Sequence, residues 1–120
     1  MSEPEKREEA PKRNEEQWLL ARGFKESWKR FKTDVISEAM TTFDHCKRAV
    51  PPEILPAKMK DHKLNGPFRG YMECHLDHDA LLIYKPMPNG AIKLLRVCEH
   101  ADLRGPKAKA LAKQLKQDEP

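Results

Sequence analysis

The sequence predicts a single small α+β domain in which helices cover one face of an antiparallel sheet. Its length of 120 residues suffices for one modest hydrophobic core. Residues 24–50 contain neither Gly nor Pro and carry helical periodicity. Residues 69–99 instead form three apolar or alternating runs joined by short turns, which is the pattern of a β-meander. Helices followed by strands in separate blocks predict a two-layer fold.

Charge divides the chain into three parts. We expect a disordered, charged tail over residues 1–16, a folded domain over residues 17–104, and a basic C-terminal helix or tail over residues 105–120. The formal net charge is +4, although the N-terminal tail holds six Glu against four Lys or Arg. The positive charge therefore concentrates in residues 17–117, because residues 118–120 add two more acids. This balance favours a polyanionic partner, nucleic acid first and an acidic protein second, with plain solubility as the alternative.

The cysteines and the hydropathy pattern indicate the compartment. Cys46, Cys74 and Cys98 are widely separated in the sequence. No signal-peptide pattern precedes them, and no apolar run approaches the length that crosses a membrane. We therefore predict free thiols in a cytoplasmic protein that makes no contact with a membrane.

A short strand and two helices are expected to begin the domain. Residues 17–22 are apolar and precede Gly23; periodicity leaves strand and helix open, and the glycine favours a strand. A first helix follows, and Asp34 is the expected N-cap of a second. In the first helical stretch, helical spacing predicts that one face packs in the core. Its residues are Phe24, Trp28, Phe31 and Val35. The second helix is expected to bury Ile36, Ala39, Met40, Phe43 and Cys46.

Three strands and a last helix are expected in the second half. The strands cover residues 69–76, 80–85 and 91–99, and Asn89-Gly90 is a strong hairpin turn before the third. A thin apolar stripe among lysines after Pro106 predicts a short basic helix that is marginal alone. Side chains alternate between the two faces of the first strand. One face carries Tyr71, Glu73 and His75, and the other carries Met72, Cys74 and Leu76.

Polar side chains suited to acid–base chemistry fall on the outer face of this predicted sheet. They are His62, His75, Asp79, Arg96 and His100. Together they suit RNA cleavage without a metal, in which a base takes the proton of a ribose 2′-hydroxyl and an acid protonates the 5′-oxygen. Arginine would hold the charge of the phosphate in the transition state. Histidines on an ordinary solvated surface are the alternative, and a one-residue slip of register would turn His75 inward.

A metal site is the rival use of histidine and cysteine. The chain has no C-x-x-C, no H-E-x-x-H and no H-x₃₋₅-H motif. Cys74 and His75 are neighbours that point to opposite faces of a strand and could not easily share an ion. Cys74 and Cys98 are better interpreted as small core residues. We predict neither a metal nor a cofactor.

One family resemblance rests on a combination of motifs in the second half. The string LPAKMKDHKLNGPFRGYMECHLDHDALLIYK, followed by LLRVCEHADL, contains K-D-H-x-L-x-G, G-Y-x-x-x-H, L-I-Y-K and R-x-x-x-H. This set resembles the YafQ branch of the RelE/ParE superfamily of bacterial toxins. The match runs from about Leu55 to Leu103, and the expected upstream order of strand and two helices is compatible with it.

The resemblance implies a ribosome-dependent mRNA endonuclease that enters the ribosomal A site and cuts the codon there. It also implies a cognate antitoxin, often with a ribbon-helix-helix part, and operator DNA bound only through the antitoxin complex. By resemblance, His75, His100 and Asp79 would carry the acid–base work, Arg96 would stabilise phosphate, and His62 would position the backbone or assist the acid. Basic residues expected to contact RNA are Lys60, Arg69, Lys85 and Arg104.

Two positions depart from the family pattern. Ala80 stands where a bulky aromatic, often Trp, follows the turn aspartate, and Arg104 stands where the pattern H-x-x-L-F ends in an aromatic. Losing groups that stack on a base would weaken substrate positioning by about 1–3 kcal/mol each. Arg104 could stack its guanidinium or grip phosphate instead. The departures leave two alternatives open: an altered or inactive member of the fold acting on another target, and a basic RNA-binding module.

Overall fold

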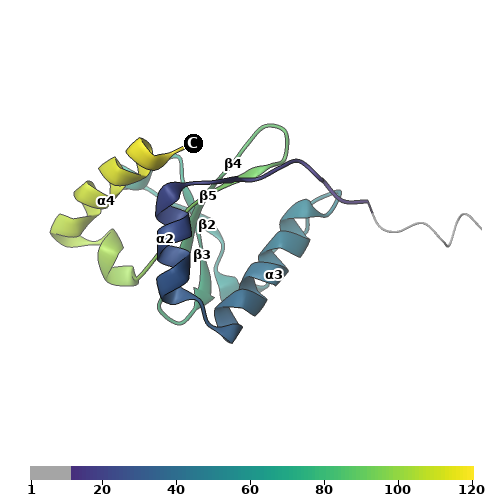
Figure 1. Ribbon diagram of the computed structural model, residues 1–120, viewed down its shortest axis with the longest axis horizontal. Coiled ribbons are helices and arrows are strands. Elements are labelled where there is room, and N and C mark those ends of the chain that lie inside the picture. Colours follow the sequence, from purple (N-terminus) through teal and green to yellow (C-terminus); the bar gives the residue numbers. More distant parts are fainter. Residues whose placement is uncertain (1–11) are drawn as a thin grey trace, which may run out of the picture.

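A five-stranded mixed sheet organises the molecule (Figure 1). The computed structural model describes residues 12–120. The strand order is β1-β5-β4-β3-β2, with β1 parallel to β5 and every other pair antiparallel. The α+β class and the central meander are therefore confirmed. The strands are β1 (Leu19–Leu20), β2 (His62–Lys63), β3 (Met72–Asp77), β4 (Ala80–Pro86) and β5 (Ile92–Cys98).

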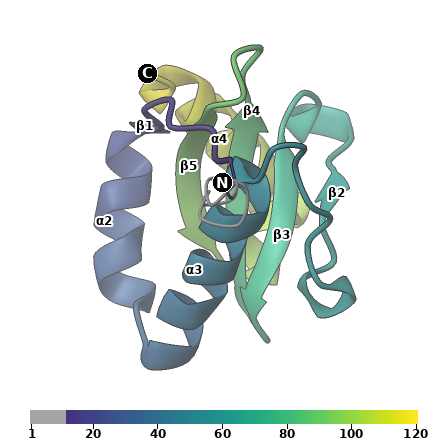
Figure 2. The same ribbon diagram turned by 90° about the vertical axis from the view of Figure 1, so that its right-hand side faces the viewer.

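Two helices between β1 and β2 cover the first face of the sheet. In Figure 2, α2 (Arg22–Phe31) lies beside β5 and α3 (Asp34–Arg48) crosses in front of the sheet. Thr33, not the expected Asp34, is the N-cap of α3, because its hydroxyl accepts the Ile36 N–H at 3.1 Å. Asp34 is the first helical residue, where its charge favours the positive end of the helix dipole. Gly23 lies inside α2, so the expected strand shrinks to two residues.

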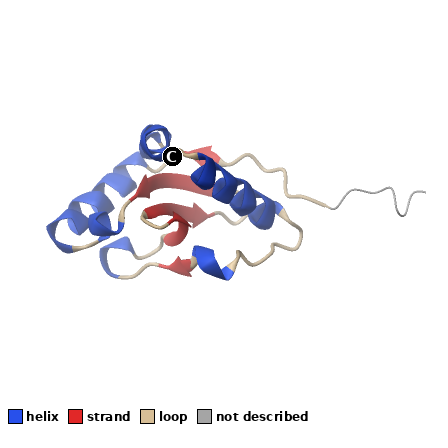
Figure 3. Ribbon diagram, turned by 90° about the horizontal axis from the view of Figure 1, so that it is seen from below, coloured by secondary structure: helices blue, strands red, loops and turns tan. Residues whose placement is uncertain are grey.

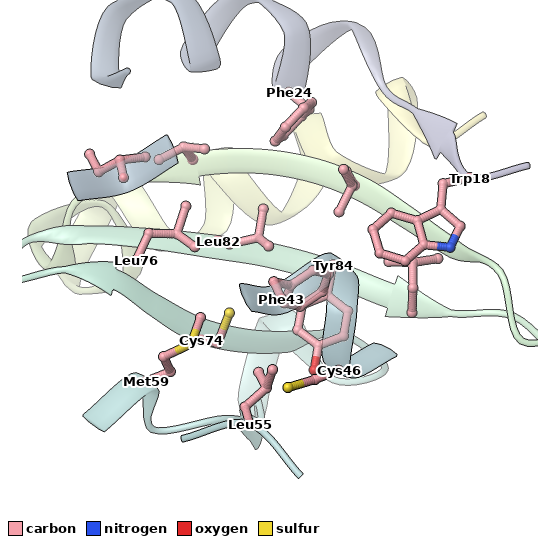
Figure 4. Close-up of a cluster of buried hydrophobic side chains, with 14 of the residues drawn as sticks. Trp18, Phe24, Phe43, Cys46, Leu55, Met59, Cys74, Leu76, Leu82 and Tyr84 are labelled. Carbon is pink, nitrogen blue, oxygen red and sulfur yellow. The ribbon is translucent and has the colours of Figure 1, made fainter. Parts of the chain in front are cut away.

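The first core fills the space between these helices and the sheet (Figure 4). Phe43 is completely buried and meets the rings of Trp18 and Tyr84 edge to face, at centroid distances of 5.7 and 4.9 Å. Ile36 and Cys46 are buried beside it, as the helical spacing predicts. Val35 is 56% exposed, because the break at Thr33 rotates its position away from the core.

A third helix covers the second face of the sheet, which was expected to be open. This helix, α4 (Gly105–Asp118), lies on the side of the sheet opposite α3 (Figures 1 and 3). The number of layers is thus three, where two were predicted. Its stripe of Ala108, Leu111, Ala112 and Leu115 packs in one buried cluster with Leu81, Ile83 and Leu95. The expected boundary between residues 104 and 105 therefore falls between two packed elements. Packing of α4 on this buried cluster stabilises the helix.

The N-terminal tail is described only in part. The expectation of disorder over residues 1–16 falls largely on residues 1–11, which lie outside the described residues. Residues 12–16 contact the C-terminal end of α3: Arg48 Nη1 donates to the carbonyls of Asn14 and Glu16, both at 2.9 Å. Among residues 12–120, no helix is long and apolar enough to cross a membrane.

Candidate active site

The segment that carries the K-D-H motif is tied to the core by its aspartate. Asp61 accepts a hydrogen bond from the hydroxyl of Tyr84 and forms an ion pair with Lys47 Nζ at 3.1 Å. Tyr84 is completely buried, and burial together with the bond to Asp61 raises its pKa. Lys60, just before, has a left-handed backbone with φ of 48°, which is uncommon for a residue other than glycine. Asp61 therefore positions the neighbouring His62 and does not itself reach the site.

A buried carboxylate lies between two of the expected histidines. Glu73 is 5% exposed, and its Oε1 lies 3.5 Å from Nε2 of both His62 and His75. The strand register explains the geometry, because His62 on β2 pairs directly with Glu73 on β3. The Nδ1 of His62 contacts the Lys60 carbonyl at 2.6 Å, which can only accept, so that nitrogen donates. Sequence reasoning assigned Glu73 to the correct face but gave it no role; a charged residue amid an apolar alternating run was the available signal.

Asp79 and His100 form an aspartate–histidine pair beside His75. Asp79 accepts the backbone N–H of His100 at 2.8 Å and contacts its ring Nδ1 at 2.6 Å. These hydrogen bonds to His100 lower the pKa of Asp79, so the carboxylate is ionised at neutral pH. The carboxylate then holds a proton on Nδ1 and leaves Nε2 of His100 available for proton transfer.

The two histidine rings meet across the ends of β3 and β5. His75 and His100 have ring centroids 5.2 Å apart at an interplanar angle of 78°. Burial lowers the pKa of His75, which Glu73 opposes and His100 reinforces. His75 is therefore a neutral imidazole at neutral pH, able to accept a proton.

Both histidines open onto a cleft of about 570 Å³ between β3 and α3. Its polar wall holds Lys60, His75 and His100, and its opposite wall includes Val35 and Ala39. A second hollow on the other side of His100 is lined by Asp79 and Arg104. Two of the expected RNA-binding cations, Lys60 and Arg104, therefore stand beside the histidines. Ala80, at the position of the missing aromatic, is buried in the first core and lies outside both hollows.

Arg96 is the expected site residue that stands apart. Ile83 pairs with Glu73 on one side and with Arg96 on the other, and its side chain is completely buried in the cluster with α4. Arg96 lies in a separate groove between α2 and α4, with its Nη2 3.4 Å from Oδ2 of Asp118. The structure thus gathers four of the five expected residues and separates the fifth. The other expected cations are also distant: Lys85 pairs with Glu119, and Arg69 caps a short 3-10 turn.

Metal-ligating groups do not cluster in the described part of the chain, where no set of three His, Cys, Asp or Glu side chains is placed to hold an ion. Cys46, Cys74 and Cys98 are free and buried. Burial raises the pKa of Cys74, and it raises that of Cys98 to about 12. These thiols are core residues and not nucleophiles.

Comparisons with known proteins show the family of this chain. Residues 17–105 match the family described as "Bacterial toxin of type II toxin-antitoxin system, YafQ". The mRNA interferase toxin YafQ of Escherichia coli K12 is 41% identical over 51 residues, 42% of this chain and 54% of that protein. The chain thus spans about half the length of the curated relatives it matches.

Solved structures extend the likeness over most of the fold. The YafQ of the E. coli DinJ–YafQ complex matches with a TM-score of 0.58 and 27% identity, covering 76% of this chain and all of that one. A copper-bound mutant toxin from Helicobacter pylori matches with a TM-score of 0.58 and 25% identity, covering 73% of this chain and 98% of that one. With the family match spanning most of its residues, the chain belongs to the YafQ family of bacterial type II toxin–antitoxin toxins.

Proposed function

We propose that this protein is an mRNA interferase that cuts codons on the ribosome by metal-independent acid–base chemistry. The observation that carries the proposal is the convergence of His75 with the Asp79–His100 pair at one cleft. The names of its curated relatives, mRNA interferase toxins, support the same reaction.

The geometry suggests separate roles for the two histidines. His75 is neutral at neutral pH and suits the base that removes the proton of the ribose 2′-hydroxyl. His100 has its Nδ1 held by the ionised Asp79 and its Nε2 left available, and it suits the acid that protonates the 5′-oxygen. Glu73 orients His62 and His75 and is a positioning residue.

The charge of the phosphate in the transition state falls to cations near this cleft. Lys60 lines the cleft with both histidines, and Arg104 lines the adjoining hollow with Asp79 and His100. A positive side chain at either position can stabilise the phosphate oxygens. In this arrangement Lys60 and Arg104 take the role expected of Arg96, which is paired with Asp118.

Membership of the family also indicates the partners of this protein, an antitoxin and the translating ribosome. The E. coli YafQ is solved in complex with DinJ. We expect this toxin to be held inactive by an antitoxin encoded beside it, with a ribbon-helix-helix part that binds operator DNA. The mRNA and the ribosomal A site would be its targets, in the cytoplasm, where free buried thiols persist.

The test is a paired induction experiment in bacteria. Wild type and His100→Ala are expressed while growth is followed and mRNA 5′ ends are mapped. We expect growth arrest and new cuts inside codons with wild type, and neither with His100→Ala. His45→Ala is the matched control, because His45 is an exposed histidine of α3 that does not line the cleft.

Three other outcomes would revise the proposal. Arrest that persists in His100→Ala without cuts would assign another target to the fold. RNA binding without arrest or cuts would assign a basic RNA-binding module. Cleavage of ribosome-bound mRNA by purified protein should survive prior removal of transition metals; its loss would contradict metal independence.

A further inference from the structure

The last helix of the chain carries charges in the order that its own dipole disfavours. The family match ends at residue 105, where α4 begins. Lysines are spread along α4, its first turn has no acidic residue, and the acids Asp118 and Glu119 stand at its C-terminal end. A helix stabilises negative charge at its N-terminus and positive charge at its C-terminus. Within α4, Asp118 Oδ1 accepts from Gln114 Nε2 at 2.9 Å, and both acids also contact cations outside the helix.

Glu119 binds three donors from the sheet. Its carboxylate accepts from Lys93 Nζ at 2.9 Å, from the Tyr71 hydroxyl at 3.0 Å and from Lys85 Nζ at 3.2 Å. Its side chain is 17% exposed. Burial disfavours the charge, but the bonds from these three donors outweigh it and lower the pKa of Glu119. A single carboxylate thus accepts hydrogen bonds from two lysines and one tyrosine hydroxyl.

Asp118 faces Arg96 in the neighbouring groove. The contact is a single long one, 3.4 Å from Nη2 to Oδ2, and Nε of Arg96 is buried without a hydrogen-bond partner among the described residues. A guanidinium has five donors in a fork that fits phosphate. A β-carbon on Gly23 would lie 2.7 Å from this Nη2 and 3.1 Å from the Asp118 carboxylate, so glycine makes room for the pair.

A bulge in β5 places these cations on one face. Leu95 is the extra residue, because Tyr84 pairs with Leu94 while Ile83 pairs with Arg96. Lys93 and Arg96, three apart, consequently both point towards the acidic end of α4. The same face includes His75, because His75 pairs with Leu81, two residues before Ile83 on β4.

We propose that Lys85, Lys93 and Arg96 form a binding site for the phosphate backbone of single-stranded RNA, which the acidic end of α4 occupies in the isolated chain. Two carboxylates stand where two phosphates of a bound strand would lie. RNA binds when the contacts of Asp118 and Glu119 with these cations break in the last turn of α4. Leu115, one turn earlier, stays buried. The inference rests on the proposed function, which supplies RNA as the substrate. It adds that the acidic end of α4 competes with RNA for these three cations.

The test neutralises the acids without removing the helix. The affinity of Asp118→Asn/Glu119→Gln for a short single-stranded RNA oligonucleotide is compared with wild type across salt concentrations. We expect roughly tenfold tighter binding at low salt, and a log–log salt slope steeper by about 2 as three cations become available at about 0.7 each. Glu26→Gln/Glu53→Gln is the matched control, because it changes the formal charge equally at exposed positions elsewhere.

A double-mutant cycle assigns the gain to the site. In a background of Lys85→Ala/Lys93→Ala/Arg96→Ala, neutralising the acids should change RNA affinity by less than about twofold. An equal gain in the Glu26/Glu53 control, or no gain in Asp118→Asn/Glu119→Gln while circular dichroism reports an intact fold, would overturn the proposal. Tighter binding of polyglutamate without tighter binding of RNA would assign the site to an acidic protein, and also overturn it.

The outcome is independent of whether the protein cuts mRNA. RNA affinity is measured without ribosomes, and cleavage is scored separately on translating ribosomes. Cleavage by wild type with no gain in affinity would reject the internal competitor and keep the nuclease. A gain in affinity without cleavage by any variant would keep the binding site and reject the nuclease.

Discussion

Two ends of the sheet use the same residue types in different ways. At the His75 end, Glu73 and Asp79 each hold histidines and leave a cleft open beside them. At the Lys93 end, Asp118 and Glu119 contact cations beside a helix, and the side chains of Lys93 and Arg96 are 18% and 24% exposed. The difference teaches that a carboxylate contact prepares a group for chemistry where it fixes a ring and leaves one ring nitrogen accessible, and blocks a group where it covers the cation beside a helix.

The largest effect is expected at the open end, from Asp79→Asn. The asparagine can still accept the His100 N–H, but it removes the anion that holds the ring proton. We expect cleavage of ribosome-bound mRNA to fall by roughly 10²–10⁴-fold, the usual contribution of a proton-transfer group. Asp79 is exposed, so the thermal midpoint should barely change. Single-turnover cleavage close to the wild-type rate would place the chemistry elsewhere.

A smaller effect is expected from Glu73→Gln, which removes charge but keeps volume. Glu73 raises the pKa of His75 against burial, so the variant should titrate His75 at a still lower pH. A weaker base should also slow cleavage, by about tenfold, the scale typical of residues that orient a functional histidine. Histidine NMR titrations together with a pH–rate profile check both. An unchanged His75 midpoint would show that the two groups are not coupled in solution.

The smallest effect is expected at the closed end, on stability at acid pH. The pKa of Glu119 is lower in the folded protein than in the unfolded chain, so its contribution is complete above the ordinary glutamate range and disappears as the pH falls through the folded value. In urea unfolding from neutral to acid pH, wild type should therefore lose more stability than Glu119→Gln. Parallel curves for wild type and Glu119→Gln would mean that the contacts of Glu119 contribute nothing.

The sequence predicted the parts of the fold that rest on periodicity. The meander and the buried positions Ile36, Phe43 and Cys46 follow from spacing, because one face of each element is apolar. The cover provided by α4 was missed, since a stripe with only two leucines among lysines does not indicate what it packs against. The bulge at Leu95 has no sequence signal of its own, yet it decides which face Arg96 and Lys93 share.

The candidate site was predictable as a set of residues more than as a geometry. Residue type and strand parity placed His62, His75, Asp79 and His100 on one face, and the structure brings them together. Parity also placed Arg96 there, but it could not indicate that Ile83 and α4 would fill the intervening space. Glu73 lacked a role because its two partners come from a register that only the folded sheet defines.

The bond between Tyr84 and Asp61 bears on how genetic screens of this protein would be interpreted. Substitutions at either residue would score as loss of toxicity, together with those at Asp79 and His100, although neither side chain reaches the cleft. The two classes separate by suppression. Loss at Tyr84 or Asp61 comes from a loosened segment, so second-site mutations that stabilise the core, or growth at lower temperature, can restore toxicity. Loss at Asp79 removes a charge that no stabilising mutation supplies.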